Sequence, residues 1–447
     1  MLIIFRYLLA ENHFTSIRIL EQRSNVGGVW NYVPLSEPAA STAKEESSHP
    51  TPPPTPPNET KSSAISFPTP IYDRLETNVV RPLMGFSDLD WPADTPLFPS
   101  HQQVLAYLEV YAKQILHLVS LETQVVSVRT TADEHWSVRS LNLVTGSEME
   151  EVFDAVVVAS GHYDLPFVPS VPGMHDWEEK YPGSISHAKT FRAPDHFAGK
   201  KVVVVGNMAS GSDIGAQIKE VCASPLIFSV KEPTTTVPTS PDAEVLEKPP
   251  ITHFEPTTRT LTFADSTTVS GVDEVLYCTG YLYDYPFLPA SVFNPSSDTT
   301  TPRKPTFQPP RLDHFLLPPT HPTLAFMQLT MKIIPFTFAE TQASVISRLW
   351  SGRLSLPLPT PPPSYPAEDE KLEKRHMLTY PADADYINFT YDWVMSAEGE
   401  GGKTPPKWGE RERWMRRECL AFKKAWQGLG ERRFEVQTLE ALGFMLE

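Results

Sequence analysis

The alternation of apolar and polar residues along the chain predicts helices and strands in turn, which is the order of an α/β protein. Apolar residues at the helical period predict helices, and short continuous apolar runs predict strands buried on both faces of a sheet. The helical pattern covers residues 2–12, 100–118 and about 409–427. The strand pattern covers 16–20, 123–129, 135–144, 152–159, 201–205, 226–230 and 272–277.

One part of this pattern has the order strand, glycine-containing loop and helix start, which is typical of a dinucleotide-binding unit. The apolar run 201–205 leads into Gly206, and Gly211 follows. Glycine permits a tight turn, and the N–H groups at the start of the next helix attract a diphosphate. Met208 replaces the middle glycine of G-x-G-x-x-G, so an ordinary strand–turn–helix remains the alternative. The candidate cofactor-binding residues of this loop are Gly206, Asn207, Ser210, Gly211 and Asp213.

Two polar residues, Ser229 and Lys231, lie at the end of the next predicted strand of this unit. A hydroxyl and an ammonium group at this place suit the 2′-phosphate of NADP, whereas sites for NAD usually have an acidic residue there. The pattern therefore favours NADP. The alternative is a lysine in a solvated loop.

The beginning of the chain has the pattern of the second half of another such unit. The helix predicted at 2–12 leads into the strand at 16–20, and Glu21 ends that strand. An acidic residue at this place binds a ribose hydroxyl about 20 residues after the glycine loop. Counting back from Glu21 reaches Met1, so the sequence holds no first strand and glycine loop for this unit.

Composition excludes several classes of protein. The chain has 447 residues, a formal net charge of −16 and a pI of about 5.3, and such an acidic protein repels the phosphates of nucleic acids. Its three cysteines have neither metal-ligand spacing nor the number for a disulfide framework, so we expect a reducing, cytoplasmic location and no metal. No segment has the length and apolar character of a transmembrane helix. The sequence leaves the oligomeric state open, a homodimer included.

Proline is unusually frequent, with 46 residues, and much of it is clustered. Residues 36–70 combine proline, threonine, serine and charged residues and cannot bury a core, so they predict a disordered surface insertion.

A further motif connects the chain to a known family. Residues 181–192, with Gly183, His187 and Phe191, match the F-x-G-x-x-x-H-x-x-x-[FY] signature of the flavin-containing monooxygenases, with Tyr181 in place of the leading phenylalanine. The related Baeyer–Villiger enzymes end this signature in tryptophan. The chain thus resembles the flavin-containing monooxygenases of the fungal, dimethylaniline monooxygenase-like type, and the resemblance implies that the signature links two dinucleotide domains.

Other segments resemble the same family from about residue 8 to 355. Residues 21–30 resemble its FAD segment, which assigns to the cofactor Glu21, Gln22, Arg23, Gly27, Gly28, Val29 and Trp30. Asn78 resembles the family's catalytic amide, which lies beside flavin and nicotinamide and can donate a hydrogen bond. Thr279, Gly280 and Tyr281 resemble a crossover between the domains, and Gln342 a C-terminal flavin-side segment in which Met327-Gln-Leu329 departs from the family's glycine.

The resemblance implies an α/β fold with two Rossmann-like domains, the NADP domain (166–281) being inserted into the FAD domain (1–165 and 282–447). It also implies a monooxygenase in which NADPH reduces FAD, and a flavin C4a-hydroperoxide oxygenates a soft nitrogen or sulfur nucleophile. The partners would be O₂ and a small amine, thiol or sulfide.

Three alternatives stay open. The chain is a truncated, impaired paralogue or gene-model fragment that binds FAD poorly, because the FAD glycine loop is missing. It is a related N-hydroxylase or Baeyer–Villiger enzyme, although Phe191 argues against the latter. Or it is a scaffold whose proline-rich insertion recruits SH3- or WW-type domains.

Overall fold

The chain folds into two compact units. The computed structural model describes residues 2–34, 66–232, 245–294, 296–297, 301–356, 359–361, 374 and 376–446. Most of the proline-rich insertion, and with it the SH3- or WW-binding hypothesis, therefore lies outside the described residues. Unit 1 comprises Met1–Asn31, Leu75–His162 and Tyr283–Glu447, and unit 2 comprises Tyr32–Arg74 and Tyr163–Leu282. Each unit is built around its own hydrophobic core.

Five of the described strands of unit 2 form a parallel sheet with the order β11–β10–β9–β15–β8. In chain order these strands are β8 (Ile185–His187), β9 (Val202–Val205), β10 (Leu226–Ser229), β11 (Val245–Lys248) and β15 (Glu274–Tyr277). The continuous valine run of β9 is buried on both faces, as a central parallel strand requires.

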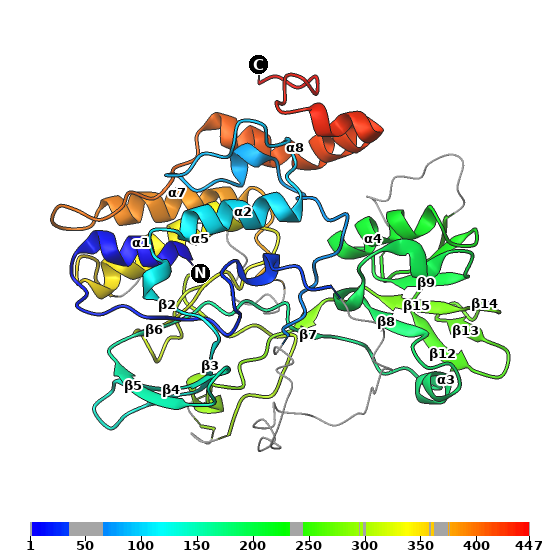
Figure 1. Ribbon diagram of the computed structural model, residues 1–447, viewed down its shortest axis with the longest axis horizontal. Helices are drawn as coiled ribbons and strands as arrows, with labels where there is room; N and C mark the ends of the chain where they lie inside the picture. The colour runs from blue at the N-terminus through cyan, green and yellow to red at the C-terminus, as the bar shows by residue number, and fades with distance from the viewer. Residues whose placement is uncertain are drawn as a thin grey trace. The chain divides into compact units, whose positions relative to one another are not determined.

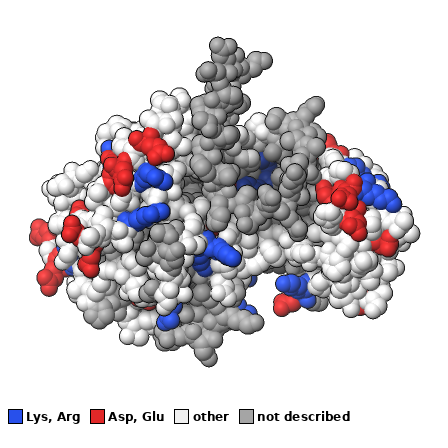
Figure 2. Space-filling model, turned by 90° about the horizontal axis from the view of Figure 1, so that it is seen from below, with Lys and Arg blue, Asp and Glu red and all other residues white. Residues whose placement is uncertain are grey.

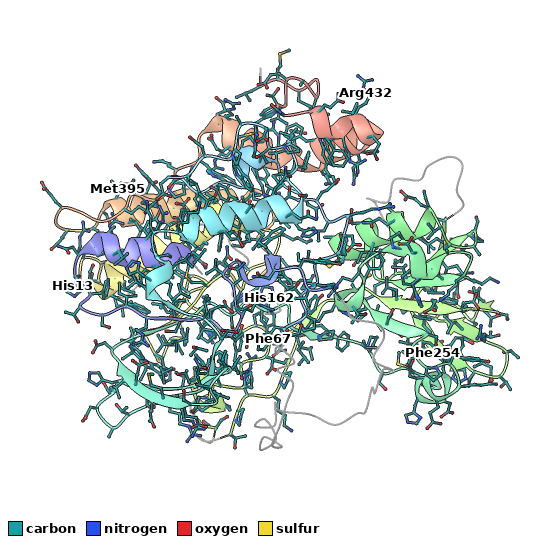
Figure 3. All side chains as sticks on the ribbon, viewed as in Figure 1. His13, Phe67, His162, Phe254, Met395 and Arg432 are labelled. Atoms are coloured by element: carbon teal, nitrogen blue, oxygen red, sulfur yellow. The ribbon has the colours of Figure 1, made fainter. Side chains whose placement is uncertain are left out.

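Helix and sheet layers cover this parallel sheet on its two sides (Figure 1). Helix α4 (Ala209–Lys219) packs on one side, where the Phe228 ring of β10 lies against the backbone of Gly215. The other side carries α3 (Met174–Lys180) and a small antiparallel sheet of β12 (Ile251–Glu255), β13 (Thr260–Phe263) and β14 (Thr268–Val269). Phe254 of this small sheet (labelled in Figure 3) meets Trp177 of α3 edge to face, with ring centroids 5.3 Å apart.

The strands of unit 1 form several short pieces of sheet. Two parallel pairs join β1 (Ile19–Leu20) to β2 (Val119–Ser120) and β6 (Val156–Val158) to β17 (Leu324–Phe326). An antiparallel meander consists of β3 (Thr123–Thr130), β4 (Trp136–Asn142) and β5 (Glu148–Phe153). The predicted single strand 152–159 is therefore wrong, because the chain bends at Asp154 and its two ends join different sheets.

The helices described in unit 1 are α1 (Leu2–Glu11), α2 (His101–Ala112), α5 (Pro335–Trp350), α7 (Ala382–Met395) and α8 (Glu410–Gln427). The residues of α5 are buried on nearly every side. Figure 1 shows α1 and α7 alongside α5, and the three pack directly. Such burial places even Glu340 and Gln342 of α5 inside the unit.

The α/β class predicted from the sequence is confirmed by these layers. None of the described helices combines the length and the apolar character that crossing a bilayer requires. On the face shown in Figure 2, acidic and basic side chains are interspersed.

Candidate functional site

The loop after β9 in unit 2 has the tight geometry expected of a phosphate-binding turn. Gly206 has φ +102°, and a Cβ atom there would lie 2.7 Å from the carbonyl oxygen of Cys278. A Cβ atom on Gly211 would collide with the carbonyl oxygen of Gly206. Both glycines are therefore required by the close approach of backbone segments, and the missing middle glycine at Met208 does not prevent the turn.

Helix α4 begins directly after this turn. The N–H groups in the first turn of a helix have no intrahelical partner and carry a positive partial charge. Ser210 lies in this first turn with its side chain exposed, while the Asn207 side chain donates to the Glu232 carbonyl at 3.0 Å. The glycine turn and the helix start together fit the diphosphate of a dinucleotide.

Asp213, one turn further along α4, has partners within unit 2. Its carboxylate accepts a short hydrogen bond from the Tyr72 hydroxyl and another from the Gln217 amide at 3.3 Å. Sequence reasoning missed Tyr72, since no motif marks it and its partner lies 141 residues away. In this structure Asp213 holds the segment around Tyr72 against α4.

The two residues predicted to read a 2′-phosphate differ in their surroundings. Ser229 is buried at the end of β10, where its hydroxyl donates to the carbonyl oxygen of Pro249 at 3.1 Å. Lys231 is exposed just beyond the same strand. An exposed ammonium group at the carboxyl end of a parallel strand can reach a phosphate, whereas the buried hydroxyl supports the strand end.

The signature segment contacts the antiparallel pair formed by β7 (Leu165–Pro166) and β16 (Tyr281–Leu282), also in unit 2. The Nε2 atom of His187 lies 3.1 Å from the carbonyl oxygen of Gly280, and Thr279 donates to the carbonyl of Phe167. Burial lowers the pKa of His187 to about 4, so its ring is neutral near pH 7.

The remaining signature residues have structural surroundings. Gly183 has φ +80°, and its N–H donates to Glu178 at 2.8 Å. The buried ring of Phe191 packs edge to face on Tyr72, with centroids 5.4 Å apart. Tyr281 is partly buried, which raises the pKa of its hydroxyl.

The predicted FAD segment lies in unit 1. Glu21 directly follows β1 and accepts a hydrogen bond from the Arg23 N–H at 2.9 Å, and Gln22 lies between them, partly buried. Gly27 and Gly28 have φ values of +104° and +54°, and no atom lies within 4 Å of a Cβ built on Gly28. Val29 and Trp30 follow in a 3₁₀ turn, Gly28–Trp30. A Cβ built on Gly27 would instead lie 2.5 Å from the Leu105 side chain, so only Gly28 leaves open backbone. This open backbone, the Glu21 carboxylate and the partly exposed Trp30 fit a ribose and an aromatic ring system.

Asn78 lies on a bend of unit 1 and is exposed, whereas Thr77 before it and Val80 after it are buried. Thr77 and Val80 are 4% and 0% exposed. The Thr77 hydroxyl donates to the carbonyl of Val79 at 2.9 Å, which closes the bend. An exposed amide on an anchored backbone can donate a hydrogen bond to a group outside the protein.

Gln342 lies inside unit 1, where it supports another loop. Its Oε1 atom accepts from the N–H of Gln328 at 2.9 Å, and its amide donates to Phe315 at 3.2 Å. Gln328 itself has φ +57°, a left-handed conformation that glycine adopts more readily than other residues. Gln342 therefore acts on the loop after β17.

A cavity of about 700 Å³ in unit 1 is lined by none of the cofactor-binding or catalytic residues predicted from the sequence. It lies among Arg6, Leu9, Ala10, Ser87, Asp88, Gln114, Ile115, Lys403 and Thr404. Glu340 lies behind it, 1% exposed, with Lys403 at 3.1 Å, and its burial raises the pKa of the carboxyl group although Lys403 opposes the shift. The cations at this cavity already have carboxylate partners.

Comparisons with known proteins find similar sequences and structures among flavin monooxygenases. Residues 61–238 and 242–396 match the model of the family described as "Flavin-binding monooxygenase-like". The Arabidopsis thaliana protein "Flavin-containing monooxygenase FMO GS-OX5" is 32% identical over 416 residues, which are 89% of this chain and 83% of that protein. "Flavin-containing monooxygenase FMO GS-OX-like 9" of the same plant is 32% identical over 404 residues, with 86% and 81% covered.

Two solved structures show the same fold. S-allyl-L-cysteine S-oxygenase from Allium sativum superimposes with a TM-score of 0.73 at 25% identity, over 99% of this chain and 94% of that chain. Tmm from Pelagibacter sp. strain HTCC7211 superimposes with a TM-score of 0.66 at 20% identity, over 95% and 88%. The predicted fold of two Rossmann-like domains is thereby confirmed.

Proposed function

The chain belongs to the flavin-binding monooxygenase-like family, and on this premise we propose that it is a FAD- and NADPH-dependent monooxygenase of soft sulfur and nitrogen nucleophiles. The observation that carries the proposal is the tight turn at Gly206, which leads into α4 and packs against Gly211 in the first turn of that helix. This turn binds the diphosphate of a dinucleotide. A monooxygenase that consumes NADPH needs such a site, because NADPH must bind before it can reduce the flavin.

The two units supply different binding groups. In unit 2, the N–H groups that begin α4 bind the diphosphate of NADPH, and Lys231 binds its 2′-phosphate. In unit 1, Glu21 binds the ribose of FAD, and the backbone at Gly28 approaches the flavin ring. When bound, the nicotinamide supplies a hydride, and the flavin activates molecular oxygen for transfer to the substrate.

Asn78 is the catalytic residue of the proposal. Its amide is exposed, while its backbone is anchored between Thr77 and Val80. A neutral amide donates a hydrogen bond to an oxygen atom without delivering a proton, so it orients a bound group and leaves it intact. The neutral ring of His187 donates its hydrogen bond to the carbonyl oxygen of Gly280, so His187 has a structural role in the proposal.

Sulfides are the substrates to test first. The likeness to an S-allyl-L-cysteine S-oxygenase supports sulfur as the atom that receives oxygen. A sulfide is a soft nucleophile that needs no acid or base to accept an oxygen atom, which suits a site built around a single amide.

The experiment uses the full chain purified with added FAD. Bound flavin is quantified by its absorbance, and NADPH oxidation is followed under ¹⁸O₂ with S-allyl-L-cysteine, N,N-dimethylaniline or cyclohexanone. We expect about one flavin per chain and one ¹⁸O atom in the sulfoxide or N-oxide.

The contrary results separate the alternatives. Flavin-loaded protein that oxidises NADPH but oxygenates only cyclohexanone would identify a Baeyer–Villiger enzyme. Flavin well below one per chain, even with FAD in excess, would favour the alternative in which this chain keeps the fold with impaired activity.

A further inference from the structure

The C-terminal helix α8 places a buried lysine against the backbone that carries Asn78. Lys423 is 7% exposed, and its ammonium group donates to the carbonyl oxygen of Thr77 at 2.8 Å. Glu76 lies 3.5 Å away from the same ammonium group. We propose that Lys423 is a positioning residue, which holds the Thr77 carbonyl and thereby orients the peptide that carries the Asn78 amide.

The surroundings of Lys423 hold its ammonium group at this place. The rings of Phe98 and Trp426 each have their centroids 4.8 Å from its Nζ atom, so aromatic faces stabilise the charge from two sides. A buried ammonium group is costly unless its donors find partners, and the partners here are Thr77 and Glu76. The lysine can keep its place only if the backbone at residues 76–77 keeps its conformation.

The segment is fastened at further points by the same part of the chain. Arg433 donates to Glu76 at 3.1 Å, and Arg81 donates to the carbonyl of Gln437 at 3.1 Å. On the other side, the N–H of Thr77 bonds to Pro99 at 2.9 Å. Residues 76–81 are thus held between 95–100 and the C-terminal residues 423–437, which begin near the end of α8 (Figure 1).

A purely structural role is the competing explanation, and it makes different predictions. An apolar side chain of similar length would fill the space between Phe98 and Trp426, so packing by itself does not require a charge. Lys423 lies beyond the last residue, 396, that matches the family model, so no motif of the sequence marks it. Lys423 donates to the carbonyl of Thr77, the residue that directly precedes Asn78. A purely structural role would not require this contact.

The proposal rests on the proposed function, in which Asn78 is the catalytic amide, and its test has a readout that does not depend on activity. In the full chain without cofactors, hydrogen exchange is followed in a peptide that covers 75–83 for wild type, Lys423→Met and Lys424→Met. Lys424 is the exposed neighbour on the same helix. We expect this peptide to exchange about tenfold faster in Lys423→Met than in wild type, because one charge-assisted hydrogen bond is lost. Lys424→Met should exchange at the wild-type rate.

The second readout is the hydrogen peroxide released per NADPH oxidised by the FAD-loaded protein. Lys423→Met should raise this ratio in the same direction as Asn78→Ala, with thermal stability close to that of wild type, and Lys423→Arg should restore it in part. The proposal is overturned if Lys423→Met folds and its hydrogen exchange at 75–83 equals that of wild type. It is also overturned if Lys423→Met exchanges faster but releases the wild-type amount of peroxide per NADPH, while Asn78→Ala changes that amount.

Two further outcomes are decisive. If Lys423→Met does not fold, Lys423→Gln takes its place, because the shorter side chain does not reach Thr77, and the same criteria apply. A normal peroxide ratio in Asn78→Ala would overturn the proposed role of Asn78, while the exchange data would still decide whether Lys423 holds Thr77.

Discussion

The imidazole of His187 joins two segments of unit 2 that are 93 residues apart, because its Nε2 atom lies 3.1 Å from the carbonyl oxygen of Gly280. Its Nδ1 atom accepts a hydrogen bond from the N–H of Lys189 at 3.0 Å, so the ring proton resides on Nε2 and is donated to Gly280. Lys189 in turn reaches Asp164 at 2.7 Å, beside β7. The signature histidine therefore holds the β7–β16 pair.

This geometry predicts that His187 makes unit 2 acid-sensitive. Its pKa falls from about 6.5 in the unfolded chain to about 4 in the folded protein, because burial disfavours the charged ring. The unfolded state then binds more protons between these values, so the stabilisation is complete above pH 6.5 and is lost as the pH falls towards 4. From pH 7.5 to 5 the loss is about 2 kcal/mol. Melting temperatures should fall less steeply over this range in His187→Gln than in wild type, and parallel slopes would contradict the assignment.

A second prediction concerns the glycine turn of unit 2. Gly206→Ala places a Cβ atom 2.7 Å from the Cys278 carbonyl at φ +102°, so the turn must open, and we expect about tenfold weaker NADPH binding by calorimetry. Gly271→Ala is the matched control. Gly271 has φ +67°, but its nearest neighbour is 3.9 Å away, so it should cost about 1 kcal/mol of stability and leave NADPH affinity unchanged. An equal loss of NADPH affinity in both variants would show that general backbone strain weakens binding, and that the shape of the Gly206 turn does not determine it.

The sequence predicted best where one local pattern decides the structure. The buried valine run appears as β9, and the helices predicted at 2–12 and about 409–427 appear as Leu2–Glu11 and Glu410–Gln427. Helix α5 was not predicted as a helix. Its polar residues, among them Thr337, Glu340 and Ser344, recur at the helical period, but the fold buries them together with the apolar residues. The small sheet β12–β14 was missed as well, since its strands are only 5, 4 and 2 residues long.

The candidate site shows a similar limit. Glycines that a tight turn requires, such as Gly206, could be predicted from their motif, because the backbone conformation of a turn is set by neighbouring residues. Side-chain partners come from tertiary packing, which no motif encodes. Thus Asp213 faces Tyr72, Ser229 faces Pro249, and Gln342 faces Gln328, three contacts that the sequence could not reveal.

A third prediction tests the preference for NADPH. Lys231→Ala removes the exposed ammonium group at the end of β10, and an ammonium–phosphate contact is a charge-assisted hydrogen bond. We expect the KM for NADPH to rise about tenfold while the KM for NADH changes little. Lys219→Ala, at the C-terminal end of α4, is the matched control and should leave both values unchanged. If Lys231→Ala affected both cofactors alike, Lys231 would not read the 2′-phosphate.

The last prediction compares Gln342 with its hydrogen-bond partner Gln328. Gln342→Leu keeps the volume of a fully buried side chain but removes the acceptor of the Gln328 N–H and the donor to Phe315, so it should destabilise the protein by about 2 kcal/mol or more. Gln328→Gly keeps that N–H and relieves a left-handed φ of +57°, at the cost of the side-chain bond to Pro335. These two effects oppose each other, and its stability should stay within about 1 kcal/mol of wild type. Calorimetric melting of the two variants should therefore differ clearly, and a common shift would mean that the loop after β17 does not depend on Gln342.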